Sequence, residues 1–237
     1  MSPRVAMVLA AGLGTRMGAL TRDCPKPLLR VAGRTLLDRA LDRAAEAGAQ
    51  RAVVNVHYLA PRIRAHLAGR AALPEVAISD EAAQLLDTGG GLRHARALLG
   101  EGPVWALNSD AVWTGATPLA GLAAAWDGAR MDALLQLIPR ARARAHSRPG
   151  DFFLRPDGRP ERRGAADAAP YVYSGAQIVR TEAAEGPEGP FSANLIWDRA
   201  AAAGRLFAVV HDGDWVDVGT PEGLAAAEAA LTGAEGP

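Results

Sequence analysis

The chain has little of several features that mark specialised protein classes. Its single cysteine, Cys24, excludes a disulfide within the chain and fits a reducing compartment, so we expect a cytoplasmic protein. It has no excess of either charge, with 26 basic and 26 acidic residues, which argues against a nucleic-acid partner. No apolar run approaches the ~18 residues of a membrane span, and the first residues do not resemble a signal peptide. We therefore expect no membrane partner.

What the chain does contain indicates one α/β domain over residues 1–237, because 49% of its residues are apolar. Short apolar runs alternate with amphipathic segments, which predicts a Rossmann-like, mostly parallel sheet with helices on both faces. After Pro139 the alternation weakens, and we expect a basic loop over 140–149 followed by a small mixed β part. The chain thus divides into halves at 1–138 and 139–237. The predicted strands are 5–9, 53–56, 76–78, 104–107, 133–138, 152–154, 171–179 and 206–210, and the predicted helices are 36–47, 62–67, 92–99, 119–126, 194–203 and 221–231.

The strongest motif follows the first predicted strand, where ligands of open α/β sheets are bound. Small residues there allow the backbone amides to approach phosphate oxygens closely. Arg16 can pair with two phosphate oxygens at once, and Lys26 is a point charge held between two prolines. A plain strand-to-helix turn explains the glycines but not these two cations, and the spacing fits neither the dinucleotide fingerprint nor the P-loop. The candidate phosphate-binding residues are Ala11, Gly12, Gly14, Thr15, Arg16 and Lys26.

The stretch from Leu9 to Leu37, with LAAGLGTRM, PKPL and VAGRTLL, resembles the signature of the sugar-1-phosphate nucleotidyltransferases. It departs from that pattern at Gly18-Ala19, where relatives commonly carry a proline. The resemblance implies that the chain joins a nucleoside triphosphate to a sugar 1-phosphate. A phosphate oxygen of the sugar 1-phosphate attacks the α-phosphorus in line, and pyrophosphate leaves. Lys26 would then steady the α-phosphate, while Arg16 with the amides of Gly14 and Thr15 holds the departing phosphates.

Two further motifs follow strands in the first half of the chain. Three glycines, Gly89 to Gly91, are costly in chain entropy, so they indicate either close approach to a ligand or a flexible loop leading into a helix. The resemblance implies that Thr88 and Gly89 contact the nucleotide, while Asp87 or Gln84 remains open as the reader of the base edge. Asn108-Ser109-Asp110 directly follows an apolar strand, where Asp110 is either a helix cap or a metal ligand. The resemblance favours the metal and adds Asn108 to the nucleotide site.

A second acidic position lies in the closing motif, Trp215 to Pro221. Asp217 is either a cap for the last helix or a second metal ligand. The resemblance implies that Asp110 and Asp217 share Mg²⁺, with Mn²⁺ as a substitute, and leaves open whether one or two ions are used. We expect the two to meet because both follow strand-like runs, and strand ends of a parallel sheet converge on one edge.

The compact length and the DTGGG, GDF and YSG stretches most resemble the branch of the family that uses UTP and N-acetylmuramate 1-phosphate. The resemblance assigns the sugar phosphate to Gly150, Asp151, Ser174 and Gly175. Alternatives are a mannose-1-phosphate guanylyltransferase-like enzyme, a glucose-1-phosphate nucleotidyltransferase, and a non-catalytic homologue that senses sugar nucleotides. The four charged residues that such regulators tend to lose are all present. We expect the two substrates as partners of a monomer or small homo-oligomer.

Overall fold

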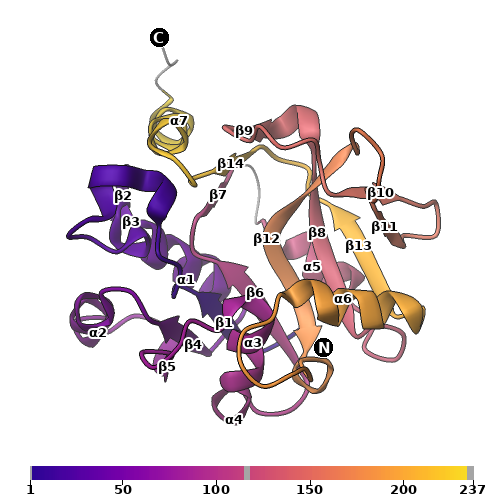
Figure 1. Ribbon diagram of the computed structural model, residues 1–237, viewed down its shortest axis with the longest axis horizontal. Helices are drawn as coiled ribbons and strands as arrows, with labels where there is room; N and C mark the ends of the chain where they lie inside the picture. The colour runs from indigo at the N-terminus through magenta and orange to yellow at the C-terminus, as the bar shows by residue number, and fades with distance from the viewer. Residues whose placement is uncertain (1, 115–117, 234–237) are drawn as a thin grey trace.

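The computed structural model describes residues 2–114 and 118–233. Within these residues one nine-stranded sheet runs through the molecule, with helices on both of its faces (Figure 1). The predicted α/β class is therefore confirmed. The strands of this sheet are β1 (Val5–Leu9), β4 (Arg51–Val56), β5 (Glu75–Asp80), β6 (Pro103–Asn108), β8 (Ala133–Pro139), β10 (Phe152–Leu154), β11 (Pro160–Arg162), β12 (Tyr171–Arg180) and β13 (Leu206–Val210).

The sheet is mostly parallel, and its order is β13, β8, β12, β6, β1, β4, β5. Strands β6, β1, β4 and β5 run parallel, whereas β12 is antiparallel to both β6 and β8. The short pair β10 and β11 joins the beginning of β12. Because β6 bonds directly to β12, one sheet connects the two sequence halves, and the ends of β1 and β6 lie beside each other at its centre.

Two apolar cores cover the two faces of the sheet. Alternate residues of a strand point to opposite faces, so Val8 enters one core and Met7 the other. The core around Val8 takes the buried sides of α1 (Leu36–Glu46), α2 (Ala60–Ala68) and α5 (Ala120–Ala125). The core around Met7 takes those of α3 (Asp87–His94), α4 (Arg96–Leu99) and α6 (Ala193–Ala202). Among the helices that the structure describes, none combines the length and the apolar character that crossing a bilayer requires.

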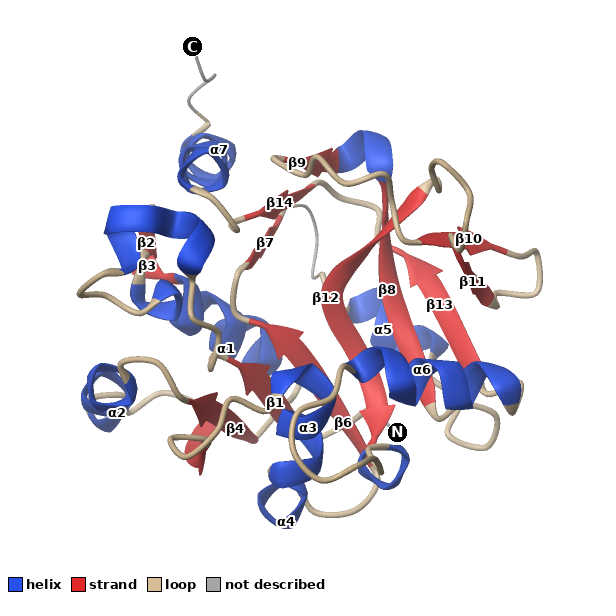
Figure 2. Ribbon diagram, in the orientation of Figure 1, coloured by secondary structure: helices blue, strands red, loops and turns tan. Residues whose placement is uncertain are grey.

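A second, three-stranded sheet lies to one side of the main one and was not predicted (Figure 2). It consists of β7 (Ala111–Trp113), β14 (Trp215–Asp217) and β9 (Ala143–Arg144). The prediction of a loop over 140–149 was wrong for its first part, which contains a 3₁₀ turn, η3 (Arg140–Arg142), and then β9. A third core joins this sheet to the hairpin of β2 (Arg30–Val31) and β3 (Arg34–Thr35), and to the last helix, α7 (Pro221–Thr232). Other 3₁₀ turns are η1 (Thr15–Thr21), η2 (Lys26–Leu28) and η4 (Thr181–Ala183).

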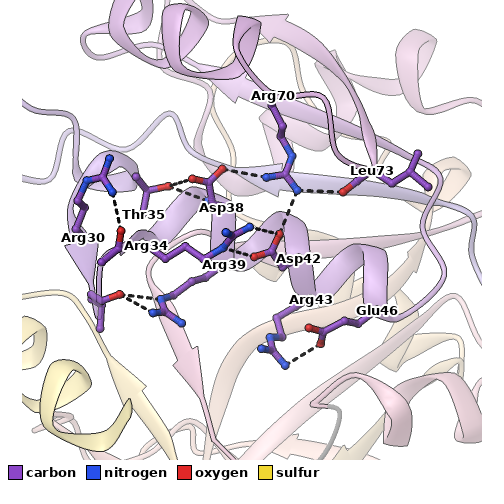
Figure 3. Close-up of polar contacts among 12 residues, drawn as sticks. Arg30, Arg34, Thr35, Asp38, Arg39, Asp42, Arg43, Glu46, Arg70 and Leu73 are labelled. Carbon is purple, nitrogen blue, oxygen red and sulfur yellow. Dashed lines mark hydrogen bonds and ion pairs between the residues drawn. The ribbon is translucent and has the colours of Figure 1, made fainter. Parts of the chain in front are cut away.

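Asp38 belongs to a polar network along α1 (Figure 3), and a bond with His66 joins that network to α2. Its carboxylate accepts hydrogen bonds from the Thr35 hydroxyl at 2.7 Å, from His66 Nε2 at 3.0 Å and from Arg70 at 3.0 Å. Burial alone would raise the pKa of Asp38, but these bonds and the charges of His66 and Arg70 outweigh it and hold the pKa below its usual value. The ionised form of Asp38 therefore stabilises the fold.

We expect Asp38→Ala to lower the free energy of unfolding by about 1–3 kcal/mol at pH 7, because it removes a carboxylate to which three donors bond. A carboxyl group whose pKa is lower in the folded than in the unfolded protein stabilises the fold at pH values above its unfolded pKa. It loses this contribution as the pH falls through its folded pKa. The difference between parent and variant should therefore shrink below about pH 4. Glu46→Ala is the control, since the side chains of Arg43 and Glu46 are 32% and 42% exposed and loss of their pair should cost less than ~0.5 kcal/mol. Equal stability of Asp38→Ala and parent in urea unfolding would contradict this role.

Candidate active site

Two adjoining cavities open where β1 and β6 end. The larger has a volume of about 490 Å³ and the smaller of about 270 Å³. Residues from both strand ends and from α3 line the boundary between them, because Leu9, Asp87, Thr88, Asn108 and Asp110 line both cavities. The sequence motifs thus converge on one site, at the edge of the sheet where they were expected.

The loop after β1 is fixed by its neighbours. The amide of Ala10 donates to Asn55 Oδ1 at 2.7 Å. Ala11 and Gly12 then line the smaller cavity. Gly14 has a left-handed φ of 68°, and a Cβ there would lie 3.1 Å from Lys26 Cβ, so the turn needs glycine. This turn starts η1, which carries Thr15 and Arg16. Arg16 lines the larger cavity, whereas Gly14 and Thr15 are not among the lining residues of either.

Lys26 and Asp110 form an ion pair at the boundary of the two cavities. The distance from Lys26 Nζ to Asp110 Oδ2 is 2.5 Å, and the two side chains are 13% and 29% exposed. Pro25 precedes the turn η2 and Pro27 follows Lys26 within it, so both flanks of the lysine have a restricted backbone. The Lys26 ammonium thus contacts a carboxylate from the turn between β6 and β7, at the boundary of the two cavities.

Asp217 reaches Asp110 by a route that differs from the predicted one. The main-sheet strand ends do not bring it there. Instead, β14 pairs antiparallel with β7, which places Asp217 opposite Ala111, the residue after Asp110. The amide of Val218 donates to the Asp110 carbonyl at 3.0 Å. The two aspartates therefore meet through the small second sheet, and the explanation by converging parallel strands was wrong.

Positive groups surround the Asp217 carboxylate. Burial alone would raise the pKa of Asp217, but a hydrogen bond and charge from His146, with the charges of Arg16 and Lys26, hold the pKa below its usual value. His146 Nδ1 lies 3.2 Å from Asp217 Oδ2. A Cβ at Gly219 would lie 2.7 Å from the Arg16 guanidinium and 2.8 Å from Asp217 Oδ1, so glycine there leaves room for both. Asp217 is ionised at neutral pH in this setting.

The helix-cap interpretation of Asp217 is excluded by the geometry of α7. The residue that caps this helix is Thr220, whose hydroxyl accepts a hydrogen bond from the Gly223 amide at 3.2 Å. Asp217 lies earlier, within β14, and lines the larger cavity. The carboxylate is therefore not needed to begin the helix.

The glycine run lies inside a helix rather than before one, so the predicted helix start at Leu92 was wrong. Helix α3 begins at Asp87, and the amides of Gly89 and Gly90 both donate to the Phe191 carbonyl. A Cβ at Gly89 would lie 2.5 Å from the Phe191 ring. These glycines are thus explained by close packing of α3 on the segment before α6.

The residues around this glycine run differ in their access to the cavities. Asp87 and Thr88 line both of them, and the Thr88 hydroxyl also accepts a hydrogen bond from the Ala193 amide at 2.9 Å. Gly89 and Gln84 line neither cavity. Of the two candidates for the reader of the base edge, Asp87 is therefore the one that a ligand in these cavities would meet.

The four residues assigned to the sugar phosphate all line the larger cavity, together with Asp217. Asp151 accepts a hydrogen bond from the Tyr173 amide at 2.9 Å. The fully buried Ser174 donates to Gln136 at 3.1 Å, within the irregular stretch of β12. Gly175 has a φ of 82°, and a Cβ there would lie 2.9 Å from Asn108 Cβ, so it packs directly on the nucleotide motif. Gly150 likewise holds a left-handed turn that no Cβ would fit.

Sequence reasoning missed several residues of the site. Asn55 and the buried Glu81 link the first loop to the wall of the smaller cavity, because Asn55 Nδ2 donates to Glu81 at 2.7 Å and the Leu86 amide donates to the same carboxylate. His146 lines the larger cavity and bonds Asp217. The available signal was a polar residue at a buried strand end for Asn55, and one histidine within an arginine-rich stretch for His146.

The family model of the MobA-like NTP transferase domain matches residues 6–235. The chain belongs to this family. It is a nucleotidyltransferase, as its signature predicted. N-acetylmuramate alpha-1-phosphate uridylyltransferase of Caulobacter vibrioides is 48% identical over 236 residues, and the protein of the same name from Neisseria meningitidis serogroup B is 36% identical over 234. Each alignment covers 97% of this chain and 98% of the relative. The structure of a UDP-glucose pyrophosphorylase complexed with UDP-glucose matches with a TM-score of 0.81, covering 98% of this chain and 100% of that one at 16% identity, which supports the fold.

Nucleotidyltransferases of this family generally use a divalent metal ion, and the pair Asp110 and Asp217 fits one. Both are carboxylates, which hard cations prefer, and both line the larger cavity: Asp217 ends β14, and Asp110 directly precedes β7, the strand with which β14 pairs. Within residues 2–114 and 118–233, no group of three or more His, Cys, Asp and Glu side chains forms a metal site. A pair of carboxylates suits an ion that completes its shell with water and substrate phosphates.

Proposed function

We propose that this nucleotidyltransferase transfers UMP from UTP to N-acetylmuramate 1-phosphate and releases pyrophosphate. Two relatives that carry the name of this activity align with nearly the whole chain, at 48% and 36% identity. The same branch of the family was inferred from the GDF and YSG stretches, which contribute to the larger cavity. We place the reaction in the cytoplasm, with the two small substrates as partners.

The two cavities suit two substrates that meet at their boundary. We assign UTP to the smaller cavity, which the 1–138 half of the chain lines, with Ala11, Gly12, Thr88 and Asn108 as contacts. We assign the sugar 1-phosphate to the larger cavity, where the 139–237 half contributes Gly150, Asp151, Ser174 and Gly175. The observation that carries this proposal is the placement of Asp110 at that boundary, paired with Lys26 and adjacent through β7 and β14 to Asp217.

This geometry supports direct transfer between the substrates by positioning and charge neutralisation. Asp110 and Asp217 would hold a divalent cation, which we propose to be Mg²⁺ with Mn²⁺ as a substitute, and it would supply positive charge that neutralises substrate phosphates. Lys26 neutralises the charge that develops on the α-phosphate. We assign the leaving pyrophosphate to Arg16, which lines the larger cavity, whereas Gly14 and Thr15 line neither cavity and form the turn that leads to Arg16. The Asp217 carboxylate in turn holds its position through His146.

A matrix of four nucleoside triphosphates and a panel of sugar 1-phosphates, with pyrophosphate release as the readout, tests the proposal. We expect the highest kcat/KM for UTP with N-acetylmuramate 1-phosphate, and complete loss of turnover in excess chelator that added Mg²⁺ or Mn²⁺ reverses. A higher kcat/KM for GTP with mannose 1-phosphate, or for dTTP with glucose 1-phosphate, would refute the substrate assignment. Absence of pyrophosphate from every pair would instead favour the non-catalytic homologue.

A further inference from the structure

The imidazole of His146 is buried between the second sheet and the larger cavity. Its side chain is 5% exposed, and it lines the cavity to which we assigned the sugar 1-phosphate but not the smaller one. Its two ring nitrogens have different surroundings. Nδ1 lies 3.2 Å from Asp217 Oδ2, whereas Nε2 has no hydrogen-bond partner among the described residues. Nδ1 of the ring thus bonds Asp217, and Nε2 is available to a ligand.

The position of His146 follows from strand register. Strand β9 runs parallel to β14 and pairs Ala143 with Trp215, so the chain after β9 passes beside Asp217. Ala145 then takes a left-handed φ of 55°, which turns the chain between β9 and His146. The ring packs edge-on against Trp215, with centroids 5.6 Å apart. An ion pair of Arg144 with Asp214 at 2.5 Å holds β9 against the approach to β14.

A second buried polar atom lies on the residue that packs against this ring. The indole Nε1 of Trp215 also has no hydrogen-bond partner in the described part of the chain, and Trp215 lines the same cavity. Side chains two residues apart on a strand face the same side, so Trp215 and Asp217 share one face of β14. The three other buried side-chain atoms without a partner in residues 2–114 and 118–233 belong to Arg70, Ser79 and Trp113, which line neither cavity. Unmatched polar atoms at this wall therefore indicate a ligand.

We propose that His146 is a binding residue for the sugar 1-phosphate: Nδ1–H holds the Asp217 carboxylate, and Nε2 makes a hydrogen bond with an oxygen of that substrate, beside the Trp215 indole. Buried polar groups in folded proteins are nearly always bonded, and an oxygen-rich ligand in the larger cavity supplies the missing partner. The same ring then couples binding of the sugar 1-phosphate to the metal site, because one edge of the ring contacts Asp217 and the other edge contacts the substrate. This inference rests on the proposed function for the identity of the substrate in the larger cavity.

Two amide substitutions separate the two edges of the ring. The amide of His146→Asn reaches the place of Nδ1, and that of His146→Gln reaches the place of Nε2. We expect His146→Asn to raise the KM for N-acetylmuramate 1-phosphate by about tenfold while the KM for UTP and the half-saturating Mg²⁺ concentration change less than about twofold. We expect His146→Gln to retain more of the sugar-phosphate affinity but to need more Mg²⁺. Calorimetric titration of the sugar 1-phosphate and Mn²⁺ binding by electron paramagnetic resonance check both without turnover.

His211→Asn is the matched control, because His211 is also buried but bonds the Thr114 carbonyl and lines neither cavity. It should leave every KM unchanged. Trp215→Phe keeps an aromatic ring against His146 but removes the indole N–H, and we expect it to raise only the KM for the sugar 1-phosphate. An unchanged sugar-phosphate KM in folded His146→Asn, or an equal rise in the KM for UTP, would overturn the inference. Failure of the parent enzyme in the substrate matrix would instead refute the proposed function itself.

Discussion

Replacing Asp217 by asparagine is expected to lower kcat at least about a hundredfold while leaving the melting temperature within about 4 °C of the parent. The substitution keeps the shape of the side chain and the backbone pairing of β14 with β7. The amide oxygen can still accept the hydrogen bond from His146, so the local packing should persist. What is lost is a negative charge that the fold holds ionised between Arg16, Lys26 and His146.

We expect Asp217→Asn to change the dependence of turnover on Mg²⁺ more than it changes substrate binding. Mg²⁺ keeps most of its water and takes only one or two protein carboxylates, so removing one of two weakens its binding strongly. We therefore expect the half-saturating Mg²⁺ concentration to rise in Asp217→Asn, and partial recovery of turnover at high Mg²⁺ or Mn²⁺. Asp110→Asn should behave similarly, with an added effect on Lys26, because it also removes the partner at 2.5 Å.

Thr220→Ala is the matched control, since Thr220 is the true cap of α7 and lies three residues from Asp217. It should cost about 0.5–2 kcal/mol of stability and leave kcat and the Mg²⁺ titration nearly unchanged. The two variants thus separate a chemical role from a structural one on the same short segment. A destabilised but fully active Asp217→Asn with normal metal dependence would remove Asp217 from the site.

Local sequence patterns predicted the central elements of the fold well. The strands β1, β10 and β13 have the predicted bounds, because each is a short apolar run that directly follows a charged residue. Helix α1 agrees within a residue, since its apolar face is regular and Thr35 caps it. These features depend on neighbours in the sequence. The candidate residues after β1 were chosen for the same reason, because they directly follow one strand end; Ala11, Gly12, Arg16 and Lys26 line the cavities, whereas Gly14 and Thr15 do not.

What the sequence did not reveal depends on contacts between distant segments. The β7–β14 pairing involves strands of three residues each, too short for a periodic pattern, yet it determines how Asp217 meets Asp110. The glycines of α3 were interpreted as a ligand contact or a flexible loop because their need for space comes from distant segments: Phe191 for Gly89, Gly189 for Gly90, and Glu81 with Asn55 for Gly91. The local signal for His146 was only that it is one histidine within an arginine-rich stretch, since its burial and its bond to Asp217 arise from the β9–β14 register.

Lys26→Arg should be nearly as damaging as Lys26→Ala, with kcat lowered on the order of 10²-fold in both. Lys26 is the only lysine among the 26 basic residues of the chain, which argues for a property that arginine does not share. Its ammonium is a compact point charge, 13% exposed, that contacts Asp110 directly. A planar guanidinium keeps the charge but needs more room, and Gly14 and Thr21 already pack tightly around this side of the loop.

The kinetic pattern distinguishes a specific contact from a general positive potential. If Lys26 acts on charge that develops during the transfer, its substitution should lower kcat while the KM for UTP changes little. The reason is that the substitution removes more stabilisation from the transition state than from the bound ground state. Arg30→Lys is the control in the reverse direction. Arg30 is exposed, its side chain bonds only the Gly33 carbonyl among the described residues, and it lines neither cavity. The kcat of this variant should therefore stay at the parent value. Near-normal kcat in Lys26→Arg, with a large loss only in Lys26→Ala, would show that any cation at this position suffices and that the ammonium has no specific place between the two substrates.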